Sequence, residues 1–162
     1  MPLKLPPMEP VQVDGIEQLR ELIGRELGPT DWLEITQADI DKFAEVSRDD
    51  QWIHVDVERA ERESPFGTTI AHGNLTLSLI DGFRGQLISQ EGVKLGINYG
   101  WDKVRFPSPV PAGSRVRATA EVQSVDELGD GWYHVVTRFV LEREGGEKPV
   151  CVADSVGRAL VA

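Results

Sequence analysis

The sequence of 162 residues is poor in cysteine and in positive charge, and it lacks long apolar runs. Its single cysteine, Cys151, excludes an internal disulfide and fits a reducing cytosol. With 17 Lys and Arg against 27 Asp and Glu, the net charge of −10 argues against a nucleic-acid partner or an anionic membrane surface. No apolar run approaches the roughly 18 residues of a membrane-spanning helix, and residues 1–12 lack a signal-peptide core. We therefore expect a cytoplasmic protein.

The remaining composition is that of one globular domain. Hydrophobic residues make up 40% of the chain and charged residues 27%, and the length suits a single core. Prolines are frequent at the start of the chain and predict an extended arm over residues 1–12: Pro2, Pro6, Pro7 and Pro10. A single domain is expected over residues 13–162, because no repeat or second composition change follows.

Helical patterns occur in three segments. Apolar residues from Ile16 to Ile23 predict a short helix that Gly28-Pro29 ends. Thr36, followed by Asp39, predicts the N-cap of a second helix that stops near Ser47, which leaves residues 49–54 in a loop. Residues 74–88 fit a strand or a helix by pattern, and their length favours an apolar helix that other structure must wrap.

The C-terminal half has the patterns of strands. Apolar and polar residues alternate over 116–123 and 133–141, and residues 150–161 and 94–105 are further strand candidates. The glycine-containing segments 128–131 and 144–147 supply hairpin turns. The sequence therefore predicts an α+β fold, with one mostly antiparallel sheet curled around the apolar helix.

Two segments carry residues suited to catalysis. Asp49 and His54 lie five residues apart, and the segment Ile70-Ala71-His72-Gly73 follows about 20 residues later. A carboxylate and an imidazole can together hold and polarise one water molecule. The N–H of Gly73, at a helix start, can bind a developing oxyanion. These groups are suited to adding water across an activated double bond.

The other reactive residue types lack a recognisable pattern. The three histidines do not have the spacing of a zinc site, so no metal is expected. We expect His72 to order the turn before Gly73 and His134 to be structural, and Cys151 to be inert packing in a strand. The sequence contains no Walker loop, no Gly-x-Ser-x-Gly and no Gly-x-Gly-x-x-Gly, and no cofactor is expected.

Three ordered motifs resemble the MaoC-like hydratases, in particular their small actinobacterial and NodN-like branch. The segment 49–54, Asp-Asp-Gln-Trp-Ile-His, resembles the hydratase-2 signature Asp-x-Asn-Pro-(apolar)-His. Residues 66–73 resemble the entry to that family's central helix. Residues 104–110, Val-Arg-Phe-Pro-Ser-Pro-Val, resemble its strand and turn near the acyl pocket. The resemblance covers residues 31–160.

The resemblance implies a hotdog fold, a homodimer, and hydration of a trans-2-enoyl-CoA to a (3R)-3-hydroxyacyl-CoA. By position, Asp49 and His54 would be the catalytic pair, Gly73 the oxyanion donor and Phe106 a substrate-binding residue. Gln51 and Trp52 stand in place of Asn and Pro in the signature and would contact the substrate from the same loop. Basic residues to be tested for contact with the CoA phosphates are Lys94, Lys103, Arg105, Arg115 and Arg117.

Two other functions remain open at this point. An acyl-CoA thioesterase is the first, because the hotdog scaffold hosts both activities and a fold does not fix a function. A non-catalytic acyl-CoA-binding subunit is the second, and the replaced residues Gln51 and Trp52 are its only indication. The sequence does not determine the acyl chain length or which of Asp49 and His54 is the base.

Overall fold

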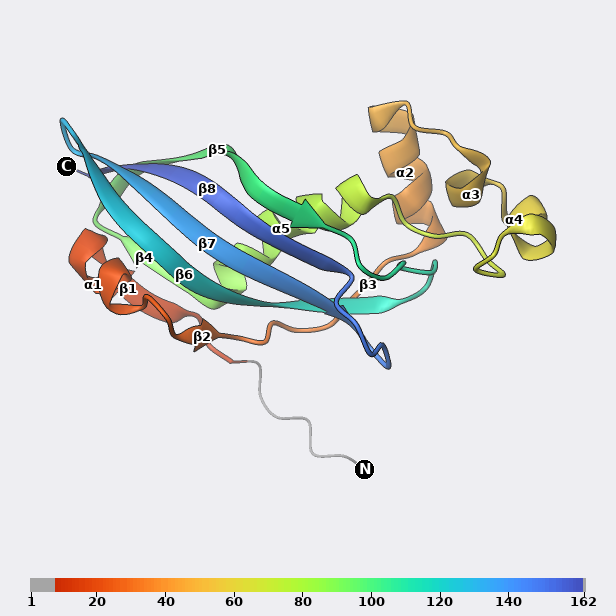
Figure 1. The fold of residues 1–162 in the computed structure, drawn as a ribbon, viewed down its shortest axis with the longest axis horizontal. Helices are drawn as coiled ribbons and strands as arrows, with labels where there is room; N and C mark the ends of the chain where they lie inside the picture. Colours follow the sequence, from red (N-terminus) through yellow and green to blue (C-terminus); the bar gives the residue numbers. More distant parts are fainter. Residues whose placement is uncertain (1–7, 162) are drawn as a thin grey trace.

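The structure is a computed structural model that describes residues 8–161, in which a six-stranded sheet curls around helix α5 (Figure 1). The strands follow the order β2-β6-β7-β8-β5, and β3 also pairs with β6. All the pairings within this sheet are antiparallel. This confirms the predicted curled antiparallel sheet around a central helix.

Short strands and helices make up the N-terminal half of the described residues, and the long strands follow. The helices are α1 (Gly15–Glu21), α2 (Gln37–Ser47), α3 (Trp52–Val55), α4 (Val57–Glu63) and α5 (Gly73–Leu87). The strands are β1 (Val11–Asp14), β2 (Glu26–Leu27), β3 (Leu33–Glu34), β4 (Ile88–Glu91), β5 (Val93–Arg105), β6 (Arg115–Gly129), β7 (Trp132–Arg143) and β8 (Cys151–Val161).

The short elements of the N-terminal half differ from the prediction. Seven residues of the expected arm, 1–7, lie outside the described residues, and residues 11–12 begin β1, which pairs with β4 in parallel. The first helix ends at Glu21, well before Gly28. His54 lies on the one-turn helix α3 and not in a loop, and α4 was not expected. Helices of one or two turns give too few residues for a periodic pattern, so tertiary contacts decide them.

Helix α5 is held against the concave face of the sheet by one side of its surface. The side chains of Ile80, Phe83 and Leu87 on this side are almost completely buried. The opposite side, which includes Asp81 and Gly82, is exposed in the single chain. Within residues 8–161, no helix is both long and apolar enough to cross a membrane.

Gly28 allows the segment before β3 to approach the end of α5. Its φ is +98°, and a Cβ atom at this position would lie 2.7 Å from Leu87 Cδ2 and 3.0 Å from the carbonyl oxygen of Ala118. Only glycine fits such a conformation beside backbone without displacing a neighbour. The sequence signal Gly28-Pro29 therefore marks a close approach to the helix rather than the end of one.

Thr36 and Asp39 begin α2 as a capping box. The Thr36 hydroxyl accepts from the Asp39 N–H, and the Asp39 carboxylate accepts from the Thr36 N–H at 3.0 Å and from its hydroxyl at 2.8 Å. These hydrogen bonds hold the pKa of Asp39 below its ordinary value, and the bond from the Thr36 N–H has the largest effect. The predicted N-cap is confirmed, and it fixes where the helix leading to Asp49 starts.

Cys151 is fully buried at the start of β8, and burial raises the pKa of its thiol to about 11. A raised pKa keeps the thiol protonated at any pH below that value, and only the thiolate reacts with alkylating agents. We expect the folded protein to resist iodoacetamide at pH 8 and to take up one label in denaturant, as measured by mass spectrometry. Rapid, complete labelling of the folded protein would contradict this.

Candidate active site

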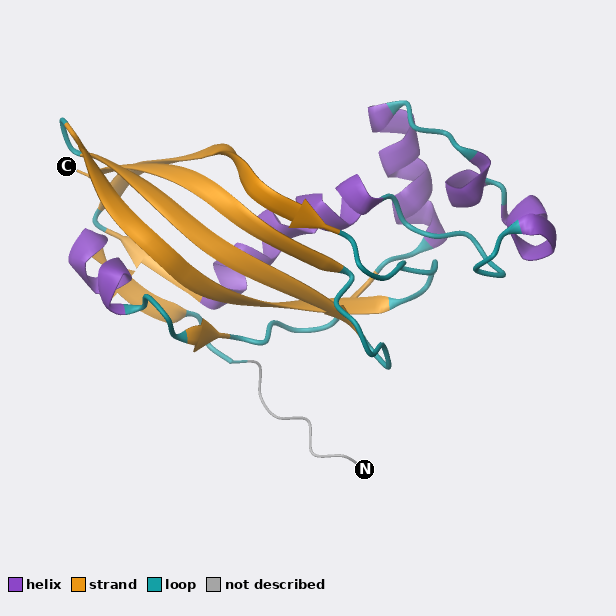
Figure 2. Cartoon of the chain, viewed as in Figure 1, coloured by secondary structure: helices purple, strands orange, loops and turns teal. Residues whose placement is uncertain are grey.

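Helices α2, α3 and α4 gather at one end of the molecule, beyond the sheet, and the N-terminal end of α5 reaches toward them (Figure 2). Helix α2 ends at Ser47, and Arg48 adopts a left-handed conformation with φ of 66°. This reverses the chain direction immediately before Asp49. The Asp49 N–H is held by the Ser47 hydroxyl at 3.3 Å, and the Asp49 side chain is exposed.

Both the ring and the backbone carbonyl of His54 make hydrogen bonds. Its Nδ1 lies 2.7 Å from the carbonyl oxygen of Ile70. A carbonyl oxygen only accepts, so Nδ1 carries the proton, and in the neutral ring Nε2 is left as a base. The carbonyl of His54 accepts from Gln37 Nε2 at 2.8 Å, and Gln37 in turn accepts from the buried hydroxyl of Thr69. The ring therefore has a fixed orientation and a fixed tautomer.

His72 connects the two catalytic candidates. Its ring stacks on that of His54 with centroids 3.9 Å apart, and Phe43 packs against its edge at 4.9 Å. Its Nε2 donates to the backbone carbonyl of Asp49 at 2.8 Å. The expectation that His72 orders the turn before Gly73 was too narrow, because this residue also holds Asp49 and His54 in place.

The three side chains form one cluster. One oxygen of Asp49 and one ring nitrogen each of His54 and His72 lie within 4.8 Å of one another. Sequence reasoning gave the pair Asp49 and His54, and the structure brings the two together. Sequence reasoning missed the supporting residues Gln37 and Thr69. No local pattern links them to His54, which lies 17 positions after Gln37 and 15 positions before Thr69.

The cluster contains residue types that bind metals, but its geometry favours a water molecule. Each imidazole already uses one nitrogen on a backbone carbonyl. The two rings are stacked with centroids 3.9 Å apart and an interplanar angle of 23°, so their remaining lone pairs lie in separate, nearly parallel planes and do not converge on one ion between them. A tetrahedral or octahedral ion needs its ligand lone pairs to converge. The absence of a metal stays a prediction.

Gly73 is the first residue of α5, directly after His72. The first N–H groups of a helix have no partner within it and lie at its positive end. A Cβ atom at Gly73 would lie 2.8 Å from ring atoms of Phe106. The expected oxyanion donor and the expected substrate-binding aromatic residue are thus in contact, although they are 33 positions apart in the sequence.

Further candidate residues lie at α3 and on β6. Gln51 is exposed at the N-cap of α3, and the ring of Trp52 has the guanidinium of Arg59 at 4.3 Å from its centroid. Two of the basic residues considered for CoA contact, Arg115 and Arg117, form ion pairs with Glu144 and Glu142 and lie over the ring of Trp32. Their guanidinium groups are therefore already neutralised in part.

Comparison with known proteins agrees with this geometry. The family described as "MaoC like domain" matches residues 18–143 of the chain. The chain is 48% identical over 145 residues to the 3-hydroxyacyl-thioester dehydratase Z of Mycobacterium tuberculosis, covering 90% of this chain and 95% of that protein. It is 43% identical over 134 residues to Nodulation protein N of Rhizobium leguminosarum bv. viciae, covering 82% and 83%.

The fold is also similar to a solved enzyme. The unliganded R-hydratase PhaJ1 from Pseudomonas aeruginosa matches with a TM-score of 0.65 and 26% identity, over 86% of this chain and 83% of that one. These matches confirm the resemblance to the MaoC-like hydratases and the expected hotdog fold.

Proposed function

The chain belongs to the MaoC-like domain family, as an enzyme of the dehydratase type, and from this premise we propose that it is an (R)-specific enoyl-CoA hydratase. It would add water to a trans-2-enoyl-CoA to give a (3R)-3-hydroxyacyl-CoA, and catalyse the reverse dehydration. The observation that carries this proposal is the meeting of Asp49 and His54 beside the start of α5. The names of the relatives, a 3-hydroxyacyl-thioester dehydratase and an R-hydratase, support it.

In the proposed mechanism Asp49 and His54 hold one water molecule. The carboxylate of Asp49 accepts one hydrogen of the water, and Nε2 of His54, the bare nitrogen of the ring, accepts the other. The oxygen then attacks C3 of the enoyl thioester as a proton moves to the pair. Positioned proton transfers of this kind contribute about 10²–10⁴-fold to a rate.

The electrons displaced by this attack move to the thioester oxygen as an enolate. The N–H of Gly73 at the positive end of α5 would stabilise this charge. The enolate then collapses as C2 takes a proton from the Asp49–His54 pair. One water is consumed, and the carbon skeleton and the thioester bond remain intact, so no cofactor is required.

Product analysis of trans-2-enoyl-CoA substrates tests the proposal. We expect the absorbance of the conjugated enoyl group to fall while CoA remains esterified, with the 3R product on chiral analysis. Release of free thiol would indicate the thioesterase alternative. Binding of these thioesters without conversion at any chain length would indicate the non-catalytic alternative.

We also propose that the protein is a cytoplasmic homodimer. Strand β5 is an edge of the sheet, and it carries the exposed apolar side chains of Leu95, Ile97 and Tyr99. Such an edge favours pairing with a second copy, which would also cover the exposed side of α5. We expect light scattering at micromolar concentration to give twice the mass of one chain, and a mass of one chain under these conditions would refute the dimer.

The single buried thiol of Cys151 supports the cytoplasmic location.

A further inference from the structure

His72 is an almost completely buried histidine to which the proposed mechanism gives no proton to transfer. Its backbone forms the N-cap of α5. Its carbonyl oxygen accepts from the N–H of Thr76 at 3.2 Å and from the Thr76 hydroxyl at 3.4 Å, which closes the first turn of the helix. The backbone of His72 therefore fixes where α5 begins, and with it the position of the N–H of Gly73.

The side chain of His72 does not stabilise the helix that its backbone begins. Residues preferred at an N-cap are Ser, Thr, Asp and Asn, because their side-chain oxygen accepts from a free N–H of the first turn. The side chain of His72 makes no such bond. Its Nε2 instead donates to the backbone carbonyl of Asp49, which lies 23 positions earlier in the sequence. This position therefore serves the loop after α2 at the expense of an ordinary cap.

The other ring nitrogen of His72 has no hydrogen-bond partner. Nδ1 is buried, and none of the described residues donates to it or accepts from it. In the neutral ring Nδ1 is bare, because Nε2 carries the hydrogen that the Asp49 carbonyl accepts. Buried polar atoms are nearly always paired, and a phenyl ring would fill the same space without an unpaired nitrogen. Packing alone therefore does not account for an imidazole here, and the bond from Nε2 is its one polar contact.

This bond is the shortest of the hydrogen bonds that hold Asp49. The Asp49 N–H reaches the Ser47 hydroxyl at 3.3 Å, and the Asp49 carboxylate accepts from the N–H of Gln51 at 3.5 Å, so both of these bonds are long and stay within the same loop. The bond from His72 measures 2.8 Å and comes from a different segment. Bonds near the usual length of 2.9 Å are stronger than those at the limit of the range. His72 is thus the main attachment of the Asp49 backbone to the rest of the fold.

The ring of His72 is itself held between two aromatic side chains. Phe43 of α2 lies on one side with ring centroids 4.9 Å apart, and His54 of α3 is stacked with centroids 3.9 Å apart. Contacts between rings restrict both the tilt and the sliding of each ring. The Nε2–H of His72 therefore points in one direction, and the carbonyl that it meets is confined to one place.

We propose that His72 is a positioning residue that sets Asp49 relative to the N–H of Gly73. The inference rests on the proposed function, in which Asp49 holds the water and the Gly73 N–H binds the thioester oxygen. The attacked carbon and this oxygen belong to one conjugated group, so the two protein groups must keep a fixed separation. His72 connects them, because its ring bonds the backbone of Asp49 and its own backbone starts the helix at Gly73. A displacement of about 1 Å can cost about 10²-fold in rate.

Two substitutions separate the hydrogen bond of His72 from its packing. His72→Phe keeps a ring between Phe43 and His54 and removes the donor, and we expect kcat for hydration to fall at least about tenfold while KM changes less than about threefold. His72→Gln loses the stacking but can place an N–H near the position of Nε2, and it should lose less than about threefold in kcat. His134→Phe is the matched control, because it removes an imidazole from β7, outside the cluster, and should leave kcat unchanged.

A double-mutant cycle shows whether His72 acts through Asp49. In the Asp49→Asn background, where the water is already poorly held, His72→Phe should lower kcat by less than about a further twofold. A general defect of packing would instead multiply the two losses. Circular dichroism and urea unfolding establish that each variant is folded under the conditions of the assay.

A wild-type kcat in His72→Phe would overturn the proposal, as would equal losses in His72→Phe and His72→Gln or multiplied losses in the double variant. NMR relaxation of the backbone amides tests the same proposal without turnover. The Asp49 amide should gain mobility in His72→Phe and keep its wild-type mobility in His72→Gln, and an unchanged Asp49 amide in His72→Phe would contradict the inference. If the wild-type protein converts no trans-2-enoyl thioester, the proposed function is rejected, and the relaxation measurement still decides whether His72 holds Asp49.

Discussion

Asp49→Asn and His54→Gln are each expected to lower kcat for enoyl-CoA hydration by at least about 10²-fold. The asparagine variant would keep the size of the side chain and lose the negative charge that orients water. The glutamine variant would keep one donor toward the carbonyl of Ile70 and lose the basic nitrogen that the present hydrogen bond leaves free. Stopped-flow or steady-state loss of the enoyl absorbance measures the effect.

The fold should survive both substitutions, since Asp49 is exposed and the contacts of His54 with the chain are partly preserved. Asp50→Asn is the matched control, because this neighbouring carboxylate is exposed and lies outside the cluster. Near-wild-type turnover in either active-site variant would reject the assignment. A loss of circular dichroism signal together with the loss of activity would show that structure and not chemistry had been removed.

Phe83→Ala is expected to destabilise the protein by about 3–5 kcal/mol. Phe83 is 2% exposed on the side of α5 that packs against the sheet, and truncation leaves a cavity that the rigid sheet cannot close. Domains of this kind have a free energy of unfolding of about 5–15 kcal/mol, so the loss is a large share of the total. Urea unfolding followed by circular dichroism measures it.

Val46→Ala serves as the control for this stability experiment. Val46 is 83% exposed on α2, and its truncation should change the free energy of unfolding by less than about 0.5 kcal/mol. A change below about 1 kcal/mol for Phe83→Ala would show that the packing of α5 on the sheet is not what holds the two together. Because α5 carries Gly73 as its first residue, the same substitution should weaken thioester binding.

The active-site pair was predictable because it lies within one motif. Asp49 and His54 are five residues apart, and their order and spacing are set by the chain itself. The part played by His72 was predictable only in outline, since its stacking on His54 depends on how the segment before α5 returns to α3. The tautomer of His54 was not predictable at all, because the backbone oxygen of Ile70 that fixes it has no side-chain signature.

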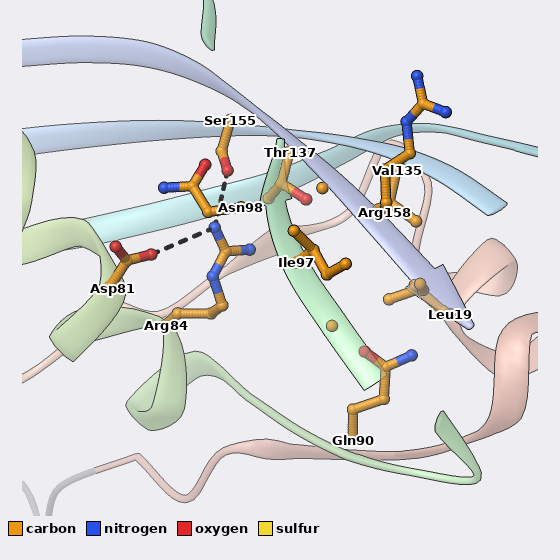
Figure 3. Close-up of a pocket in the computed structure, with 13 residues that line it drawn as sticks. Leu19, Asp81, Arg84, Gln90, Ile97, Asn98, Val135, Thr137, Ser155 and Arg158 are labelled. Carbon is orange, nitrogen blue, oxygen red and sulfur yellow. Dashed lines mark hydrogen bonds and ion pairs between the residues drawn. The ribbon is translucent and has the colours of Figure 1, made fainter. Parts of the chain in front are cut away.

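A pocket of about 320 Å³, whose lining includes Arg84 and Ser155, gives the opposite case (Figure 3). Its residues come from α1, α5, β4, β5, β7 and β8, and each has the sequence context of an ordinary strand or helix residue. Arg84 lies in a helix whose pattern predicts apolar contacts, and nothing in its neighbours indicates that it reaches Ser155, 71 positions later. Only the register of the sheet places the small residues opposite the helix.

The sequence by itself determined the local features: the capping box of α2, the alternation of the long strands, the hairpin turns and the motif that carries the catalytic pair. These depend on residues within a few positions of one another, whose spacing is fixed by the geometry of a helix or strand. The tertiary structure alone decided the short helices α3 and α4, the hydrogen bonds that orient His54, and the lining of the pocket beside Arg84. Those features need contacts between distant segments, and such contacts exist only after the sheet has closed around α5.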